Sequence, residues 1–269
     1  AFERTSGVLA RSGVDAGSLP GGPPPPSEVE GAWTEKRYPS LYVPFQARLD
    51  CIERLWEGCA TRWARTRLVS VERAAQGARL QLGLEREGER LWVETKALVV
   101  ATGRWSTRWM RPLLEPVGVR FGFQRAEVGV RLELDAGHPF FVSLPGVDGK
   151  LRFRDGRAEY RTFCTCRTGE VVLGRAGGFR AYSGRADGPR TSRSNVGLVA
   201  RTIDPELGRS IEEALLKGSE PETLTLTEWR REGETRLRWS LGLPGAELAY
   251  RAMKQLVGRY PGLLDAEVK

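Results

Sequence analysis

The sequence predicts a mixed α/β (α+β) fold in two parts, and three patterns carry that prediction. Between residues 44 and 95, a helical pattern precedes three short alternating runs. Consecutive apolar residues follow at 97–101, as expected for a strand that is buried on both faces of a parallel sheet. Beyond residue 120, alternating runs outnumber helical ones. We therefore expect a partial α/β layer with a β-meander, followed by a mixed β-rich region.

Length and composition indicate a globular chain with distinct segments. Its 269 residues are 40% hydrophobic and include eight Trp, which is enough for one large core or two ordinary ones. Prolines run through 23–26 behind two glycines, and such sequence forms loops or extended linkers. The expected division is therefore an extended linker at 1–40, the partial α/β layer at 41–120, and the β-rich region with C-terminal helices at 121–269.

Cysteine and hydropathy patterns bear on the cellular setting. No apolar run approaches the roughly 20 residues that cross a bilayer, so we expect no membrane span. Four Cys in a chain of this length make a poor disulfide framework. A reducing, cytoplasmic location is the expectation.

The net charge of +8 comes almost wholly from arginine. Clustered arginine supplies phosphate affinity, so a nucleic-acid or anion-binding module is one hypothesis. A general replacement of Lys by Arg, as in a GC-rich or heat-adapted organism, is the other explanation. The sequence has no RRM signature and no zinc-finger spacing, so nucleic acid is not favoured.

The first part begins with a helix over about 44–63, where Phe45, Leu49 and Ile52 recur at helical intervals. Three strands are expected at 67–72, 79–85 and 90–95, separated by turn sequence, and they form the meander. The apolar strand at 97–101 reads ALVVA and leads into Thr102-Gly103. A short helix that contains Pro112 is expected at 107–114.

The second part contains mainly strands, expected at 127–134, 151–154, 159–165, 170–173 and 196–202. Residues 177–195 are rich in Gly, Ser and Arg and predict a loop region. Helices are expected at 205–216 and 246–257. Asp204 precedes Pro205 and predicts an N-cap with proline in the first turn.

The order of helix, meander and strand ending in VVATGR, over about 44–104, resembles the flavoproteins with a Rossmann FAD domain. The resemblance implies a partial FAD-binding Rossmann-like layer, in which Gly103 lets the backbone approach the flavin nucleotide closely. The implied cofactor-binding residues are Leu68, Ala101, Thr102, Gly103 and Arg104. An ordinary sheet without a ligand is the alternative. The sequence lacks the GxGxxG fingerprint, so a missing segment or a partner chain is expected to complete the flavin site.

Three later motifs occur in one order: GVRLE at 129–133, FCTC at 163–166 with GEV at 169–171, and SNVGL at 194–198. They resemble an uncharacterised bacterial group of FAD-dependent dehydrogenases, which has GVRIE, FCMCPGGEV and an NSAL-like segment in that order. This chain has Arg167-Thr168-Gly169 where the group has Pro-Gly. Residues that could face the substrate are Arg131, Cys164, Cys166, Arg185, Arg193 and Asn195.

Two interpretations of the CxC pair stay open. Residues two apart on a strand share a face, so both thiols could point at one site in a redox or substrate-facing role. Buried structural cysteines are the other interpretation. A metal needs about four ligands and His138 is the single histidine, so no metal is expected. His138 lies in a Gly-His-Pro turn and is expected to be solvated.

The resemblance implies an FAD-dependent oxidoreductase that transfers a hydride between an unknown small-molecule substrate and FAD. No catalytic residue is assigned, because the flavin does the difficult chemistry. Two alternatives remain: an Arg-rich nucleic-acid or anion-binding module, and a non-catalytic interaction subunit. Arg185 and Arg193, with Arg180 and Arg190, could hold a carboxylate or phosphate, or they could be ordinary loop arginines.

Overall fold

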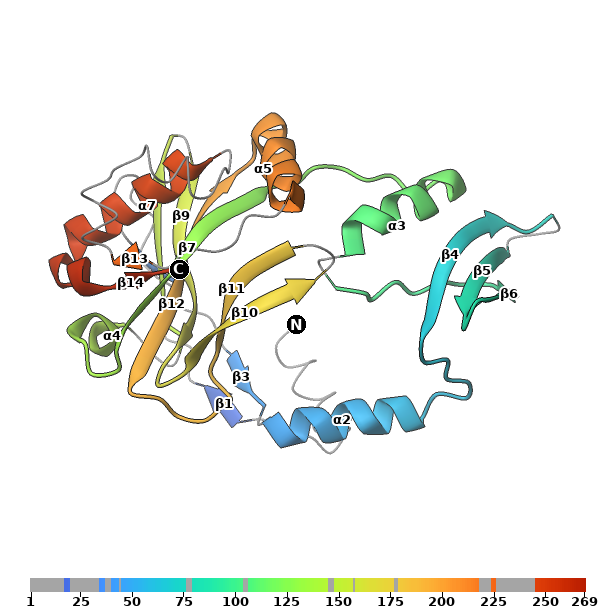
Figure 1. Ribbon diagram of the computed structural model, residues 1–269, viewed down its shortest axis with the longest axis horizontal. Coiled ribbons are helices and arrows are strands. Elements are labelled where there is room, and N and C mark those ends of the chain that lie inside the picture. Colours follow the sequence, from blue (N-terminus) through green and yellow to red (C-terminus); the bar gives the residue numbers. More distant parts are fainter. Residues whose placement is uncertain are drawn as a thin grey trace. The chain divides into compact units, whose positions relative to one another are not determined.

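The chain forms two compact units, which we call unit 1 (Ala1–Cys51 and Gln124–Lys269) and unit 2 (Ile52–Phe123). The structure is a computed structural model (Figure 1). It describes residues 17–19, 34–36, 40–43, 45–75, 79–103, 106–144, 148–156, 158–176, 179–217, 224–225 and 245–269. Helices and antiparallel sheets are both present, which confirms the mixed α+β class.

The helix expected at the start of the first part is α2 (Phe45–Glu57), which contributes residues to both units. It ends six residues earlier than the expected boundary at 63, where the Gly58 amide donates to the Arg54 carbonyl at 2.9 Å. None of its residues is buried, and Ile52 and Leu55 are 61% and 67% exposed. The apolar side of this helix is therefore open to solvent.

Unit 2 contains the expected meander. Its strands are β4 (Thr66–Arg73), β5 (Leu80–Arg86) and β6 (Glu89–Thr95), joined in one antiparallel sheet of that order. Alternation of side chains buries Val71 and Leu82 and leaves Trp92 about half exposed. The short helix is α3 (Thr107–Leu114), as expected, and a 3-10 turn η2 (Glu115–Val117) follows it.

The apolar segment at 97–101 is not the buried strand that the sequence predicts. It has no strand pairing in the part of the chain that is described, and Val99 is 88% exposed. Directly after β6, the Thr95 hydroxyl donates to the Ala97 carbonyl at 2.8 Å, which turns the chain away from the meander. Every described strand pair is antiparallel, so the parallel layer is also not formed among these residues. A run of apolar residues becomes a buried strand only where other strands flank it.

Unit 1 is built on a seven-stranded antiparallel sheet, which confirms the expected β-rich second part (Figure 1). The strands in sheet order are β13 (Leu224–Thr225), β14 (Glu267–Val268), β7 (Ala126–Asp135), β12 (Arg193–Thr202), β9 (Ala158–Cys166), β8 (Lys150–Asp155) and β2 (Thr34–Lys36). Central strands β7 and β12 pair over ten residues each. The four expected strands in this sheet all lie within observed ones.

A second hairpin in unit 1 corrects the expected loop at 177–195. Strand β10 (Glu170–Ala176) pairs antiparallel with β11 (Phe179–Arg185), so Arg180 and Arg185 lie on a strand, and Arg193 begins β12. The sequence of β11 is rich in Arg, Gly and Ser, which conceals its alternation. Pairing with the adjacent β10 supplies the backbone hydrogen bonds that composition alone does not predict.

The expected linker at 1–40 lies mostly outside the described residues. Three short pieces of the N-terminal part of unit 1 are described. They are β1 (Gly17–Leu19), which pairs with β3 (Ser40–Tyr42), and β2, which pairs with β8.

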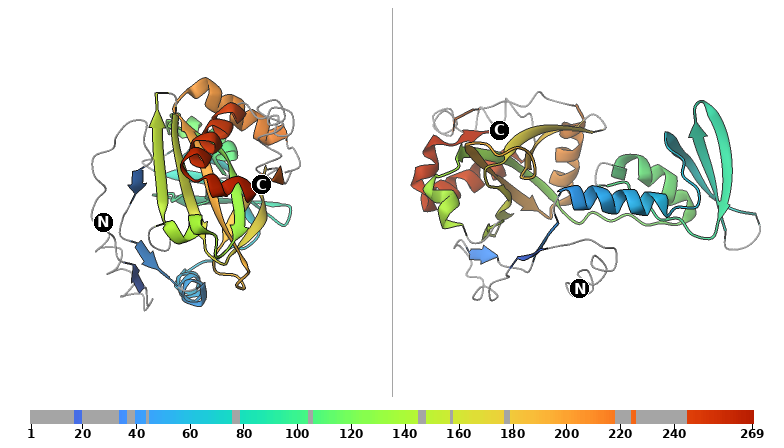
Figure 2. Two further views of the ribbon diagram at one scale, coloured as in Figure 1. Left: turned by 90° about the vertical axis from the view of Figure 1, so that its left-hand side faces the viewer. Right: turned by 90° about the horizontal axis from the view of Figure 1, so that it is seen from below.

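Helices cover one face of the large sheet. Helix α7 (Ala246–Arg259) packs against β7 and β12, and α5 (Pro205–Lys217) also packs near β7 (Figures 1 and 2). Met253 and Leu256 of α7 are buried with Leu132 and Leu198 of the sheet. Full burial of each such side chain contributes roughly 1.5–3 kcal/mol, so this face holds the main core. No helix of the described residues has the length and apolar character needed to cross a membrane.

Two helix starts illustrate local capping. The Asp204 carboxylate accepts from the amides of Glu206 and Leu207 at 2.9 and 3.3 Å, as expected for an N-cap. His138, expected to be solvated, is instead half-buried and caps α4 (Pro139–Ser143). Its Nδ1 accepts from the Phe140 amide at 3.2 Å, and its Nε2 lies 3.0 Å from the Gly262 carbonyl in η3 (Pro261–Asp265). These partners require the neutral tautomer with the proton on Nε2.

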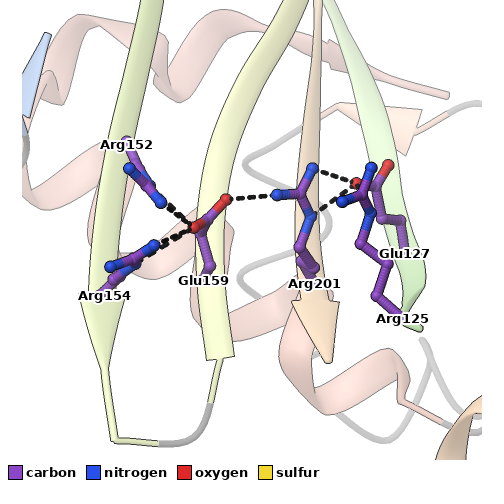
Figure 3. A network of polar contacts seen from close by, with 6 residues as sticks. All are labelled: Arg125, Glu127, Arg152, Arg154, Glu159 and Arg201. Carbon is purple, nitrogen blue, oxygen red and sulfur yellow. Dashed lines mark hydrogen bonds and ion pairs between the residues drawn. The ribbon is translucent and has the colours of Figure 1, made fainter. Parts of the chain in front are cut away.

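A network of arginines and glutamates joins four strands of the large sheet (Figure 3). Glu159 on β9 is central: it accepts from Arg152 at 2.8 Å, from Arg154 at 2.9 Å and from Arg201 at 2.9 Å. Arg201 also donates to Glu127 at 2.6 Å. Burial raises the pKa of Glu159, but hydrogen bonds and charges of its arginines outweigh that effect and leave the pKa below its ordinary value. The network therefore fixes the register of neighbouring strands.

Candidate functional site

Four residues from three separated motifs meet on the face of the large sheet opposite the main core. They are Arg131 on β7, Cys164 and Cys166 on β9, and Asn195 on β12. The Arg131 Nε donates to Asn195 Oδ1 at 2.6 Å, and its Nη2 donates to the Cys164 carbonyl at 2.6 Å. The same Nη2 lies 3.4 Å from the Cys166 sulfur. We call this group the Arg–dithiol cluster.

A β-bulge brings the two thiols of the cluster together. Asn195 pairs with Cys166 and Gly197 pairs with Phe163, so β9 carries one residue more than β12 between these pairs. The extra residue leaves Cys164 with a φ of +49°, in the left-handed region that non-glycine residues rarely adopt. The two sulfur atoms lie 3.8 Å apart. Bulges and strained residues of this kind re-aim side chains, and they concentrate at functional sites.

The two thiols differ in access. Cys166 is 2% exposed, whereas Cys164 is only partly buried. Arg131 and Asn195 are also buried, at 3% and 0% exposure. Cys164 is therefore the more exposed of the two cysteines.

The hairpin of β10 and β11 closes over the cluster and requires glycine at two positions. A Cβ at Gly184 on β11 would collide with the Arg131 guanidinium and lie 2.6 Å from the Cys166 sulfur. At Gly169, just before β10, a Cβ would lie 3.0 Å from that of Cys166. The Gly169 carbonyl accepts from Asn195 Nδ2 at 3.0 Å. Absence of a side chain at both positions lets the hairpin backbone contact the cluster.

The charge of Arg131 has no carboxylate partner within ion-pair distance among the described residues. Its nearest ionisable groups are the thiols, and a buried guanidinium favours their ionised form. A hydrogen bond from Cys166, together with this positive charge, lowers the pKa of Cys164 to about 6 despite its burial. The hydrogen bond to Cys164 and burial raise the pKa of Cys166. Both shifts favour a thiolate on Cys164 over one on Cys166.

Asp148 opposes part of this effect. Its carboxylate accepts from the Thr165 amide at 2.9 Å and pairs with Lys150 at 2.9 Å. Its negative charge raises the pKa of both thiols, although less than Arg131 and the thiol–thiol hydrogen bond lower that of Cys164. The Asp148 contact holds the bulge in place because it binds the residue between the cysteines.

The segment that departs from the resembled group, Arg167-Thr168-Gly169, leads directly out of the cluster. Arg167 donates to the carbonyls of Phe141 and of Leu144, the latter at 3.0 Å. The Thr168 amide donates to the Ser194 hydroxyl at 2.9 Å, and Thr168 also has a positive φ, of +50°. These contacts tie the turn after Cys166 to α4 and β12.

The other two expected substrate-facing residues lie outside the cluster. Arg185 pairs with Glu170 across the hairpin. Arg193 pairs with Glu267 at 2.9 Å and donates to the Glu133 carbonyl at 3.3 Å. Both guanidinium groups are thus engaged in ion pairs within unit 1.

The expected cofactor-binding residues lie in unit 2, and Arg104 lies outside the described residues. Leu68 is half-buried on β4, where it pairs with Leu84 of β5. Ala101, Thr102 and Gly103 are exposed; Gly103 has a φ of +77°. The Thr102 hydroxyl donates to Ser106 Oγ at 2.7 Å, and Ser106 Oγ donates to the Gly103 carbonyl at 2.6 Å. These bonds fix the turn that precedes α3.

Gly184 and Asp148 lie outside the motifs that the sequence offered. A glycine under a guanidinium leaves no local pattern, because the contact joins β11 to β7 across the fold. In the residues that the structure describes, no group of three or more His, Cys, Asp or Glu side chains is arranged to hold a metal ion. The sequence matches no protein-family model and no curated protein.

Proposed function

We propose that the chain belongs to an FAD-dependent oxidoreductase, with the Arg–dithiol cluster on its substrate side. One observation carries this proposal: the motifs GVRLE, FCTC and SNVGL, which carry the family resemblance, each contribute a residue to one buried cluster. Arg131 and Asn195, the first and last residues of the cluster, are 64 positions apart in the sequence. Convergence of separated motifs on one charged, strained site is the pattern expected of a functional centre.

The residues around Gly103 fit a nucleotide in one respect. The Gly103 turn has a left-handed backbone with nothing within 4 Å of the position of a Cβ, so a ligand could approach its backbone closely. The flavin, when bound, would supply the hydride chemistry. The Thr102 hydroxyl and the backbone of the Ala101–Gly103 turn would contact it.

The Arg-rich binding module is less well supported. Three arginines of unit 1, Arg152, Arg154 and Arg201, are paired with Glu159 on the large sheet. Their charge is already balanced in part, which reduces what remains for phosphate groups.

Flavin binding tests the proposal with a matched pair of variants. We expect the purified chain to bind FAD, measured by equilibrium dialysis and by the flavin absorbance bands, and Gly103→Ala to weaken that binding at least several-fold. The control is Gly88→Ala in the turn between β5 and β6. Gly88 has a φ of +87° and the same open surroundings, so both variants carry similar backbone strain. A colourless protein that takes up no added FAD, or equal effects of the two variants, would contradict the proposal.

A further inference from the structure

We propose that Cys164 and Cys166 are a redox-active dithiol/disulfide pair that exchanges with external disulfides, with Cys164 as the attacking thiolate and Cys166 as the resolving thiol. The proposal concerns unit 1 alone and requires no flavin, so it goes beyond the function proposed above. It rests on the separation of the sulfurs, on their unequal access, and on the buried charge beside them.

The separation of the sulfurs favours a bond between them. Residues at positions i and i+2 of a regular strand share a face, but their side chains stand apart along the strand. At Cys164 the bulge and the left-handed backbone bring the sulfurs to 3.8 Å. A disulfide needs about 2.05 Å, a distance that small rotations of the two side chains can supply.

The unequal access assigns the two roles. A disulfide in solution can approach Cys164, which is partly exposed, and cannot approach Cys166, which is 2% exposed beneath the hairpin. Attack from solvent therefore begins at Cys164. Cys166 can react only with a sulfur already inside the site, as a resolving thiol does.

The buried charge makes Cys164 nucleophilic. Arg131 lies beside both thiols with no carboxylate ion-pair partner among the residues described. The thiolate is the reactive form in exchange, and a pKa of about 6 places Cys164 largely in this form at neutral pH. The nucleophilicity of a thiolate falls as its pKa falls, and the best attacking thiol has a pKa near the ambient pH. A pKa of about 6 is close enough to neutral pH for Cys164 to remain a good nucleophile.

The reaction balances in two exchanges. In the first, the Cys164 thiolate attacks one sulfur of an external disulfide RSSR, which forms a Cys164–SR bond and releases one thiolate RS⁻. In the second, Cys166 loses its proton to solvent and attacks the Cys164 sulfur, which forms the Cys164–Cys166 bond and releases the second RS⁻. The external disulfide gains two electrons and the dithiol loses two. An external dithiol such as dithiothreitol reduces the Cys164–Cys166 bond by two exchanges of the same kind and is itself oxidised to a disulfide.

The small ring that results favours turnover over permanent cross-linking. A disulfide between residues two apart closes a strained ring, and strained disulfides are the more oxidising and labile ones. The oxidised pair therefore returns readily to the dithiol, as a redox centre requires and a structural cross-link does not.

The test uses the full chain with Cys51→Ser and Cys59→Ser, which removes the two other thiols. The probe is the aromatic disulfide dithiobis-nitrobenzoate at about neutral pH, where Cys164 is ionised. We expect two coloured thiols released per chain, a product lighter than the dithiol by two hydrogens in intact mass, and full recovery with dithiothreitol. The Cys166→Ser variant should release one coloured thiol and retain a mixed disulfide. The Cys164→Ser variant should react at least tenfold more slowly.

Two outcomes would overturn the proposal. One is a parent protein that retains the aromatic thiol on Cys164 without forming the internal bond. The other is a parent protein that does not react until it is unfolded. Both are measured on the parent chain, so the test does not depend on folding of the serine variants. Neither bears on FAD binding, because the experiment contains no flavin.

Discussion

Replacing Arg131 with methionine tests how much the Arg–dithiol cluster depends on its guanidinium. Arg131→Met keeps an unbranched side chain and removes two donors, one to Asn195 Oδ1 and one to the Cys164 carbonyl, both at 2.6 Å. A buried acceptor left without a donor costs about 1–3 kcal/mol, so the two lost bonds amount to about 2–6 kcal/mol. Relief of the buried charge offsets part of that loss. We expect a net decrease of about 2–4 kcal/mol in the free energy of unfolding.

Urea denaturation, with the unfolding of unit 1 monitored by near-UV circular dichroism, measures this change in the free energy of unfolding. The matched control is Arg125→Met in the same unit, where the guanidinium is exposed and lies 3.8 Å from Glu127. An exposed pair of this kind contributes roughly 0–1 kcal/mol. Equal losses in the two variants would show that the buried donors of Arg131 add nothing to stability.

The same variant should change how stability depends on pH. Cys164 has a folded pKa of about 6, below the value of about 8.5 in an unfolded chain. Its ionisation therefore contributes stability that is fully present above about pH 8.5 and is lost as the pH falls through about 6. The raised pKa of Cys166 has the opposite sign, but it acts only above this window. Stability of the parent should rise across the window, and Arg131→Met should flatten the rise; an unchanged slope would count against Arg131 as a cause.

Two further predictions concern the hairpin and the ion network. Gly184→Ala places a Cβ against the Arg131 guanidinium and should lower the free energy of unfolding by about 1–3 kcal/mol in urea denaturation. The control Gly174→Ala, on the neighbouring strand, should lower it by less than about 1 kcal/mol. Equal losses in the two variants would contradict the close contact at Gly184. Glu159→Gln removes the central carboxylate of Figure 3 and should lower the free energy of unfolding by about 1–3 kcal/mol at neutral pH. Because the folded pKa of Glu159 is lowered, the difference from the parent should shrink as the pH falls below about 4. Glu115→Gln at an exposed helical pair is its control, and a difference that persists in acid would contradict the charge-based account.

Local patterns predicted the elements whose pairing partners are adjacent in the sequence. The meander formed as expected, because each strand of β4 to β6 is followed by a turn and by its own neighbour. Helix α5 began where Asp204 predicted, because an N-cap is a contact over two or three residues. The segment at 97–101 was predicted wrongly, because burial of an apolar strand depends on neighbours that periodicity does not reveal.

The candidate site was predictable in its residues and not in its geometry. The order of the motifs indicated four site residues, Arg131, Cys164, Cys166 and Asn195. The sequence alone did not decide whether the two cysteines are buried structural residues or reactive ones. The bulge that brings their sulfurs close together arises from the register between β9 and β12. These strands are neighbours in the sheet, but the β10–β11 hairpin lies between them in the sequence. Gly184 covers the site through the same hairpin, and the Arg-rich sequence of β11 concealed that strand.

We infer that Cys166 and Arg131 together lower the pKa of Cys164, and the pH dependence of Cys164 reactivity tests this inference most directly. In the Cys51→Ser, Cys59→Ser background, the rate of alkylation of Cys164 by iodoacetamide, located by peptide mass, is measured against pH. We expect a midpoint near pH 6, and a higher midpoint when Arg131 is replaced by methionine. A midpoint at the ordinary thiol value of about 8.5 in both proteins would contradict it.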